Sequence, residues 1–237
     1  MAKVSFREQV LRAREDAIVS SVNRLLAEKG FDLMTVDEVA AEAGIAKASL
    51  YKHFTSKEEL AGAAMVRVLD RAMEQAGTLQ RDPGTSAMQR IEAMLRWTLQ
   101  VQLAGQMPSL PAQNSRLVAS LRANRAYTDA LFALSDVLGA WITQARADGQ
   151  LNAELPPEMI LYTLYARACD PVLGLLKASG NHSDAQLVEW LVTSTLEGIG
   201  KRAAPPARRL RPAAQHAAGR SSSRAPTSAS QQTCSSR

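Results

Sequence analysis

The sequence has little cysteine, few aromatic residues and no long uncharged apolar run, and each shortage excludes a class of protein. Its two cysteines, Cys169 and Cys234, have no paired spacing, which excludes a four-cysteine zinc site and is typical of a reducing compartment. No uncharged apolar run approaches the roughly 18 to 20 residues that a membrane span needs. Acidic residues interrupt the N-terminal stretch before any apolar core, unlike a secretory signal. We therefore expect a cytoplasmic protein with no membrane partner.

Patterns typical of enzymes are also missing. The three histidines, His53, His182 and His216, form no pair at metal-binding spacing. No nucleophile elbow, zinc-protease motif, phosphate-binding loop or dinucleotide fingerprint is present. In an apolar helix, Cys169 is more typical of a packed small hydrophobe than of a nucleophile. The sequence predicts that the protein is not an enzyme and has no cofactor or metal site.

The positive charge is concentrated at the C-terminal end of the chain. The net charge is +5, but it is not spread evenly. Residues 1–60 have nine Lys and Arg and ten acidic residues, and residues 61–200 have 11 Lys and Arg and 13 acidic residues. Residues 201–237 have eight and no acid. Any DNA-binding function of the body must therefore rest on local geometry. We expect 203–237 to be a disordered basic tail, which adds salt-sensitive DNA affinity, binds another acidic surface or has no role.

The remaining composition is that of a helical protein. Hydrophobic residues make up 46% of the chain and charged residues 22%, and alternating strand-like runs are scarce. The sequence predicts an all-α fold of about nine helices. Besides two short helices between residues 35 and 56, apolar residues at helical spacing indicate helices over 7–29, 57–80, 86–105, 114–148 with a break near 124, 157–178 and 184–202.

Residues 35–60 have the pattern of two short helices joined by a glycine turn. Thr35 followed by Glu38 is a capping box, which marks a helix start, and Gly44 ends that helix after an apolar stripe. A second short helix is expected over 46–54. Short helices at this spacing, with small alanines where they cross, predict a helix-turn-helix. Ser56 with Glu59 and Ser183 with Gln186 are two further capping boxes.

This stretch resembles the DNA-binding segment of the TetR/AcrR family of bacterial regulators. The family pattern is T-x-x-x-I-A-x-x-A-G-V-S-x-x-x-L-Y-x-H-F-x-S-K-E-x-L. Its counterparts here are Thr35, Val39-Ala40, Ala43-Gly44-Ile45, Leu50-Tyr51, His53-Phe54, Ser56-Lys57-Glu58 and Leu60. The resemblance covers residues 11–60. It departs at Ala46, where the family often has a serine, and this loses a helix cap worth ~1 kcal/mol.

Within the motif, eight residues are candidates for DNA contact: Thr35, Lys47, Ala48, Ser49, Tyr51, Lys52, His53 and Lys57. Leu50 and Phe54, four residues apart, are expected to anchor the second helix inward. Lys47, Ala48 and Ser49 are the candidates for base edges. The candidates for phosphate contact are Thr35, Tyr51, His53 and Lys57. Outside this motif the same residues would be interpreted as the solvated face of an ordinary helix.

The resemblance also implies a small-molecule effector bound between the central helices. Candidate lining residues are Met94, Trp97, Met107, Tyr127, Tyr162 and Tyr165, with Arg167 and Asp170 as polar anchors. The alternative is that these are core residues, because an apolar stripe at helical spacing usually packs in a core. Asp170 precedes Pro171 inside an otherwise continuous apolar helix, so we expect a kink there.

The last two predicted helices have few charges, and helices apolar on most sides need covering on most sides. We expect them to form a four-helix homodimer interface, which the resemblance also implies. The predicted domains are a DNA-binding domain over 1–56, a regulatory and dimerisation domain over 57–202 and the tail over 203–237.

The predicted function is a dimeric DNA-binding transcriptional regulator, a ligand-responsive repressor of a palindromic operator on double-stranded DNA. A transcriptional activator, an effector-independent DNA-binding protein and a helical interaction module with a vestigial motif remain alternatives.

Overall fold

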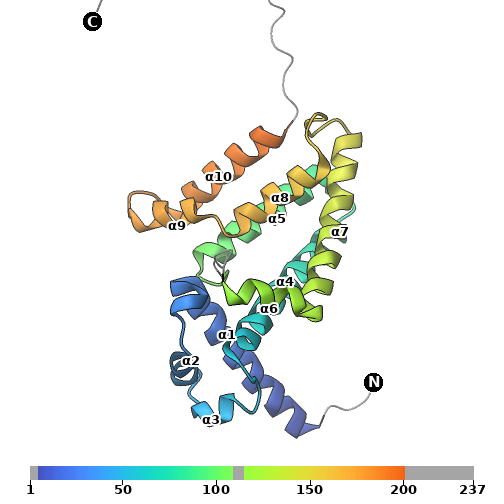
Figure 1. Ribbon diagram of the computed structural model, residues 1–237. Coiled ribbons are helices and arrows are strands. Elements are labelled where there is room, and N and C mark those ends of the chain that lie inside the picture. The colour runs from blue at the N-terminus through green and yellow to red at the C-terminus, as the bar shows by residue number, and fades with distance from the viewer. Residues whose placement is uncertain (1–4, 109–114, 201–237) are drawn as a thin grey trace, which may run out of the picture. The chain divides into compact units, whose positions relative to one another are not determined.

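The computed structural model describes residues 5–108 and 115–200, which form ten helical segments and no strand (Figure 1). The all-α prediction is confirmed. The predicted tail lies outside the described residues, as does the end of the loop before residue 115. The helices are α1 Phe6–Leu33, α2 Val36–Glu42, α3 Lys47–Leu50, α4 Lys57–Gln80, α5 Ala87–Leu103, α6 Arg116–Ala123, α7 Arg125–Ala147, α8 Pro157–Ala168, α9 Pro171–Ala178 and α10 Asp184–Ile199.

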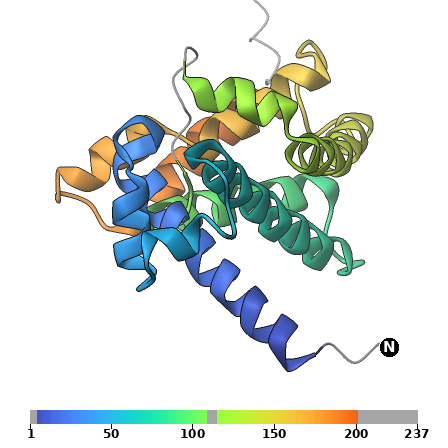
Figure 2. The ribbon, with the colours of Figure 1, turned by 60° about the horizontal axis from the view of Figure 1, so that its bottom comes forward.

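The first helix, α1, is interrupted close to its predicted end. Gly30 has a φ of 75°, a conformation that costs glycine little and other residues more. The chain then turns so that Phe31 and Met34 are buried against the following helices. At its other end, α1 extends beyond the helices that it packs on (Figures 1 and 2), and Phe6 and Leu11 are exposed there.

The helix-turn-helix forms as predicted, with a shorter second helix. Gly44 makes the turn with a φ of 67°. The predicted helix over 46–54 is regular only from Lys47 to Leu50, and Ala46 provides no side-chain cap. Beyond Leu50 the chain continues as hydrogen-bonded turns, because the Phe54 N–H donates to the Leu50 carbonyl at 3.0 Å. A missing cap leaves the first N–H groups unpaired, which is consistent with so short a helix.

The long helix α4 connects the helix-turn-helix to the rest of the chain and has the predicted bounds. Ser56 Oγ accepts the Glu59 N–H at 3.0 Å, which is half of the predicted capping box. The Glu59 carboxylate instead accepts the N–H of Thr55 at 2.6 Å. From there α4 packs against α1, α6, α7 and α5, so it touches both the N-terminal helices and the central ones.

The hydrophobic core is divided into clusters. One cluster combines α1 to α4 with two residues of α6, Leu117 and Leu121. Another combines the far half of α4 with α5, α7 and α8, and a third lies between α5, α9 and α10. Because α6 inserts into the N-terminal core, α4 and α6 both connect the two parts of the body. The described residues belong to one compact unit, and the boundary at residue 56 stays a prediction.

The expected kink near Pro171 is a full break, which corrects the continuous helix predicted over 157–178. Asp170 has a ψ of 113° and its side chain accepts the Val172 N–H at 2.9 Å, so it caps a new helix. Proline disfavours a helical conformation in the residue before it. By length and composition Pro157–Ala178 would suffice to cross a membrane, but the stretch is two helices with the Arg167–Asp170 ion pair at their junction.

Candidate nucleic-acid interface and cavity

The predicted cap of α2 is present and fixes the start of the helix-turn-helix. Thr35 Oγ1 accepts the Glu38 N–H at 3.2 Å, and the Glu38 carboxylate accepts the Thr35 N–H at 2.9 Å. Lys29 adds an ion pair to Glu38 at 2.7 Å. Hydrogen bonds from Lys29 and Thr35 lower the pKa of Glu38 to about 2. The Thr35 hydroxyl is thus engaged within its own helix cap.

The second helix of the motif, α3, and the turn after it bury and expose the side chains that the sequence predicts. Leu50 and Phe54 are buried, and Val39 and Ala40 of α2 are buried with them in the same core. The outward side chains come from α3 and the turn after it. Ser49 is half-buried, and the exposed ones are Lys47, Ala48, Tyr51 and Lys52. The structure therefore brings five of the eight candidate DNA contacts together on one accessible surface.

An acidic residue of the supporting helix holds the first of these side chains. Lys47 Nζ lies 2.9 Å from the Asp37 carboxylate, and this hydrogen bond raises the pKa of Lys47. Both side chains are largely exposed, so the pair is weak and open to competition by phosphate or a base edge.

Two candidate phosphate contacts are turned toward the protein. His53 Nδ1 lies 3.3 Å from Glu15 of α1, and the His53 side chain is 10% exposed. Lys57 Nζ lies 4.4 Å from the centre of the Phe31 ring and 3.3 Å from the Asp32 carbonyl oxygen. A cation over an aromatic face is stabilised by the ring quadrupole. In this arrangement His53 joins the turn after α3 to α1, and Lys57 joins the start of α4 to the end of α1.

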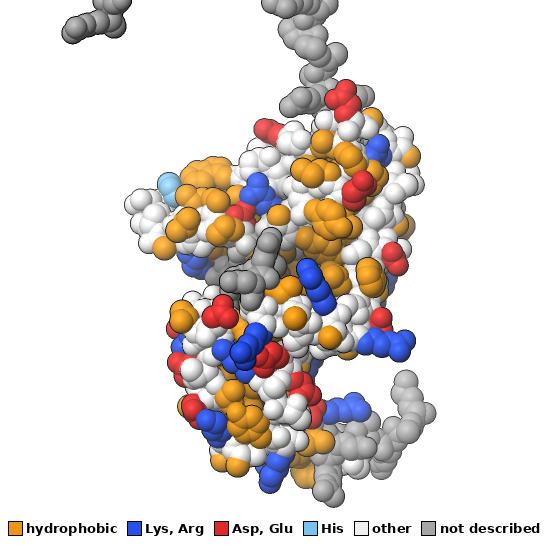
Figure 3. Space-filling model, in the orientation of Figure 1, with side chains coloured by type: hydrophobic (Ala, Val, Ile, Leu, Met, Phe, Trp, Pro, Cys, Tyr) orange, Lys and Arg blue, Asp and Glu red, His pale blue; other side chains and the backbone are white. Residues whose placement is uncertain are grey.

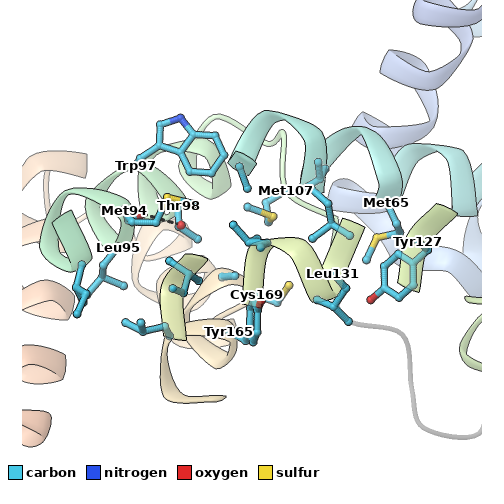
Figure 4. Close-up of a pocket in the computed structure, with 18 residues that line it drawn as sticks. Met65, Met94, Leu95, Trp97, Thr98, Met107, Tyr127, Leu131, Tyr165 and Cys169 are labelled. Carbon is cyan, nitrogen blue, oxygen red and sulfur yellow. Dashed lines mark hydrogen bonds between the residues drawn. The ribbon is translucent and has the colours of Figure 1, made fainter. Parts of the chain in front are cut away.

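A cavity of about 280 Å³ lies between α4, α5, α7 and α8. Residues of α4, α5, α7 and α8, with Met107 and Cys169 from the connecting segments, line it (Figure 4). Five of the predicted ligand residues are among them: Met94, Trp97, Met107, Tyr127 and Tyr165. The remaining lining residues are Met65, Val68, Leu69, Ala72, Ile91, Leu95, Thr98, Leu131, Leu134, Leu138, Leu164, Ala168 and Cys169.

Three predicted ligand residues lie outside the lining of this cavity. Tyr162 is 66% exposed on the outer face of α8. Asp170 is 3% exposed and caps α9. Arg167 donates to Thr195 of α10 at 2.9 Å and pairs with Asp170. The predicted polar anchors therefore join α8, α9 and α10 to one another.

Most of the wall could not be predicted from the sequence, because apolar spacing is the same around a packed core and around a cavity. The stripe of Met65, Val68 and Leu69 on α4 is one example. Cys169, which the sequence predicts to be a packed hydrophobe, is a wall residue whose thiol donates to the Pro108 carbonyl at 3.3 Å. Burial raises the pKa of this thiol to about 11, so it is protonated at neutral pH. Among the described residues no cluster could hold a metal ion.

Comparison with known proteins identifies the N-terminal helices. Residues 18–64 match the family described as bacterial regulatory proteins, tetR family. An uncharacterized HTH-type transcriptional regulator of Haemophilus influenzae is 40% identical over 87 residues, 37% of this chain and 37% of that protein. IcaR of Staphylococcus aureus, the HTH-type negative transcriptional regulator of the biofilm operon icaADBC, is 44% identical over 46 residues, 19% of this chain and 25% of IcaR. The chain thus spans well under half of these relatives.

The similarity of fold extends further along the chain than the similarity of sequence. The crystal structure of the transcriptional regulator FadR from Bacillus subtilis in complex with stearoyl-CoA superposes with a TM-score of 0.58 at 14% identity, over 77% of this chain and 98% of that one. Residues 18–64 thus match the tetR family by sequence, and the fold of the chain is similar to that of FadR.

Proposed function

We propose that the protein is a cytoplasmic, homodimeric transcriptional repressor that binds a palindromic operator and releases it when a small molecule occupies the cavity. The observation that carries the proposal is the exposed surface of α3, held on a capped and buried helix-turn-helix. Lys47, Ala48 and Ser49 would read base edges in the major groove, and Tyr51 and Lys52 would contact the backbone. Repression is favoured by IcaR, a negative regulator.

The homodimer is supported by the apolar surface of the last three helices. Met159 and Tyr162 of α8, Val172 and Leu175 of α9 and Trp190 of α10 are large hydrophobic residues left exposed in one protomer. Hydrophobic side chains gather over this part of the molecule in Figure 3. A surface of this kind marks an interaction site, and a second copy would cover it. Two recognition helices would then lie about 34–36 Å apart, one turn of DNA.

The proposed coupling runs along α4 and α6. Lys57 begins α4 beside the helix-turn-helix, while Met65 and Ala72 of the same helix line the cavity. Leu117 and Leu121 place α6 in the N-terminal core. A ligand that favours a different position of α4 would change the spacing of the two recognition helices. DNA release requires that the ligand bind the released state more tightly than the DNA-bound state.

Selection of bound duplexes from a random DNA pool tests the proposal. The expected result is an inverted repeat whose half-sites are centred about one helical turn apart. Enrichment of a single asymmetric site would contradict the dimeric mode, and no enrichment above background would contradict DNA recognition itself. Variants Lys47→Met and Ser49→Ala should shift the preferred sequence, while Tyr51→Phe should weaken binding to all sequences alike.

A further inference from the structure

The wall of the cavity has no charged side chain among its 18 described residues. A charged group moved from water into such surroundings loses its hydration without gaining a counter-ion, which costs several kcal/mol or forces the group to become neutral. The wall therefore disfavours charged ligands, whatever their shape.

Most of the polar groups in the wall already have hydrogen-bond partners within the protein. Thr98 Oγ1 donates to the Met94 carbonyl at 2.8 Å. The Tyr165 hydroxyl is 2.8 Å from Ser135 Oγ, which itself donates to the Leu131 carbonyl at 2.8 Å. Since the serine proton is engaged, Tyr165 is the donor in that pair. Each of these donors therefore has a partner within the protein.

Tyr127 is different, because in the described part of the chain its hydroxyl makes no hydrogen bond. The residue lies at one end of the cavity and Trp97 lies at the other (Figure 4). Burial raises the pKa of Tyr127, so the hydroxyl keeps its proton at neutral pH and is a donor. Tyr127 is half-buried, so its hydroxyl is free to donate to a ligand oxygen in the cavity without breaking a hydrogen bond within the described part of the chain.

We propose that the effector is an uncharged, largely apolar small molecule with one hydrogen-bonding oxygen, which accepts from the Tyr127 hydroxyl while its apolar part extends toward Trp97. This inference rests on the proposed function and specifies its ligand class. A dry apolar cavity of about 150 Å³ holds benzene, so the 280 Å³ found here suits a molecule larger than one ring or an alkyl chain of moderate length.

Three probes of equal length and different charge test the class: 1-octanol, octanoate and octylamine. Binding to the full chain at pH 7.5 is measured by the change in Trp97 fluorescence, with Trp97→Phe to confirm which indole responds. We expect 1-octanol to bind at least about tenfold more tightly than either ion. Equal or tighter binding of octanoate or octylamine would overturn the proposal, as would an absence of octanol binding up to its solubility limit.

Two pairs of variants locate the bound molecule. Tyr127→Phe should weaken octanol binding about three- to tenfold, the effect of one neutral hydrogen bond. Thr143→Val removes a hydroxyl from an exposed residue of α7 outside the cavity and should leave binding unchanged. Ala72→Leu fills part of the cavity and should reduce binding, whereas Ala13→Leu on exposed α1 should not. An unchanged affinity in Tyr127→Phe, or equal losses in Tyr127→Phe and Thr143→Val, would contradict the assigned oxygen contact.

DNA binding without any probe is measured on the same samples. If the wild-type chain selects no DNA sequence, the proposed function fails whatever the octanol result. If it selects DNA but binds the charged probes as well as octanol, only the ligand class fails.

Discussion

Asn124 lies directly against Gly62, so that a Cβ at position 62 would be 3.0 Å from the Asn124 amide nitrogen. Asn124 is the residue between α6 and α7, and its Oδ1 accepts the Tyr127 N–H at 3.1 Å. Tyr127 in turn lines the cavity. The relationship therefore connects the cavity wall, the start of α7 and the first turns of α4 in three consecutive contacts.

The substitution Gly62→Ala tests this contact. Replacing a helical glycine by alanine ordinarily stabilises by about 0.5–1 kcal/mol. Here the new methyl group would displace the Asn124 side chain and weaken a cap worth ~1 kcal/mol. We expect no gain in the free energy of unfolding and a loss of up to ~1 kcal/mol, measured by urea denaturation.

Gly77→Ala on the same helix is the matched control, because nothing lies within 4 Å of a Cβ there. It should stabilise by about 0.5 kcal/mol. Asn124→Ser, which keeps a capping oxygen on a shorter side chain, should restore stability in the Gly62→Ala background. Equal gains in the free energy of unfolding from Gly62→Ala and Gly77→Ala would show that the methyl group at position 62 fits beside Asn124 without displacing it.

Local features of the fold could be predicted from the sequence because they depend on neighbours in the chain. The capping pair of Thr35 and Glu38, the turn at Gly44 and both ends of α4 are set within a few residues. The break at Asp170 is larger than the predicted kink, because the Asp170 side chain caps a new helix through the Val172 N–H. A proline in an apolar stretch indicates a disturbance, and whether the helix resumes in line depends on packing.

The site could be predicted only in part because its remaining geometry depends on residues distant in sequence. His53 meets Glu15, 38 positions away, and no spacing rule relates them. Lys57 sits over Phe31 for the same reason. Trp97 and Tyr127 line the cavity, and large aromatic residues in central helices are natural candidates for such a wall. The α4 stripe has the same periodicity whether it meets other side chains or empty space.

Asp37→Asn is expected to strengthen DNA binding. The change removes the partner of Lys47 and one negative charge beside the DNA surface. An exposed ion pair is worth about 0.2–1 kcal/mol, so affinity should rise by about 1.5- to 5-fold in a fluorescence-anisotropy titration. Glu28→Gln, which removes the exposed partner of Arg24 on α1, is the control for net charge. An equal rise in both variants would assign the effect to net charge alone.

Glu38 gives the N-terminal domain a defined sensitivity to acid. Its pKa is lowered from 4.5 to about 2 by the bonds from Lys29 and Thr35. A lowered carboxyl pKa contributes stability that is present above the unfolded pKa and is lost as pH falls through the folded one. The Tm difference between wild type and Glu38→Gln should therefore be greatest above pH 4.5 and shrink toward pH 2. A constant difference over that range would contradict the assigned cause.

The proposed homodimer predicts different outcomes for two equally exposed leucines. Leu175 on α9 and Leu33 at the end of α1 are each 72% exposed in the protomer. Leu175→Glu would place a charge in the apolar surface of α8 to α10, where burial in an interface without a partner costs several kcal/mol. Leu33→Glu adds the same charge where no interface is proposed. Sedimentation velocity should give a dimer for wild type and Leu33→Glu and a monomer for Leu175→Glu. Because the two half-sites would no longer be bound together, Leu175→Glu should also lose most of its operator affinity while retaining its helical circular dichroism. Dimers in all three proteins would place the subunit interface elsewhere.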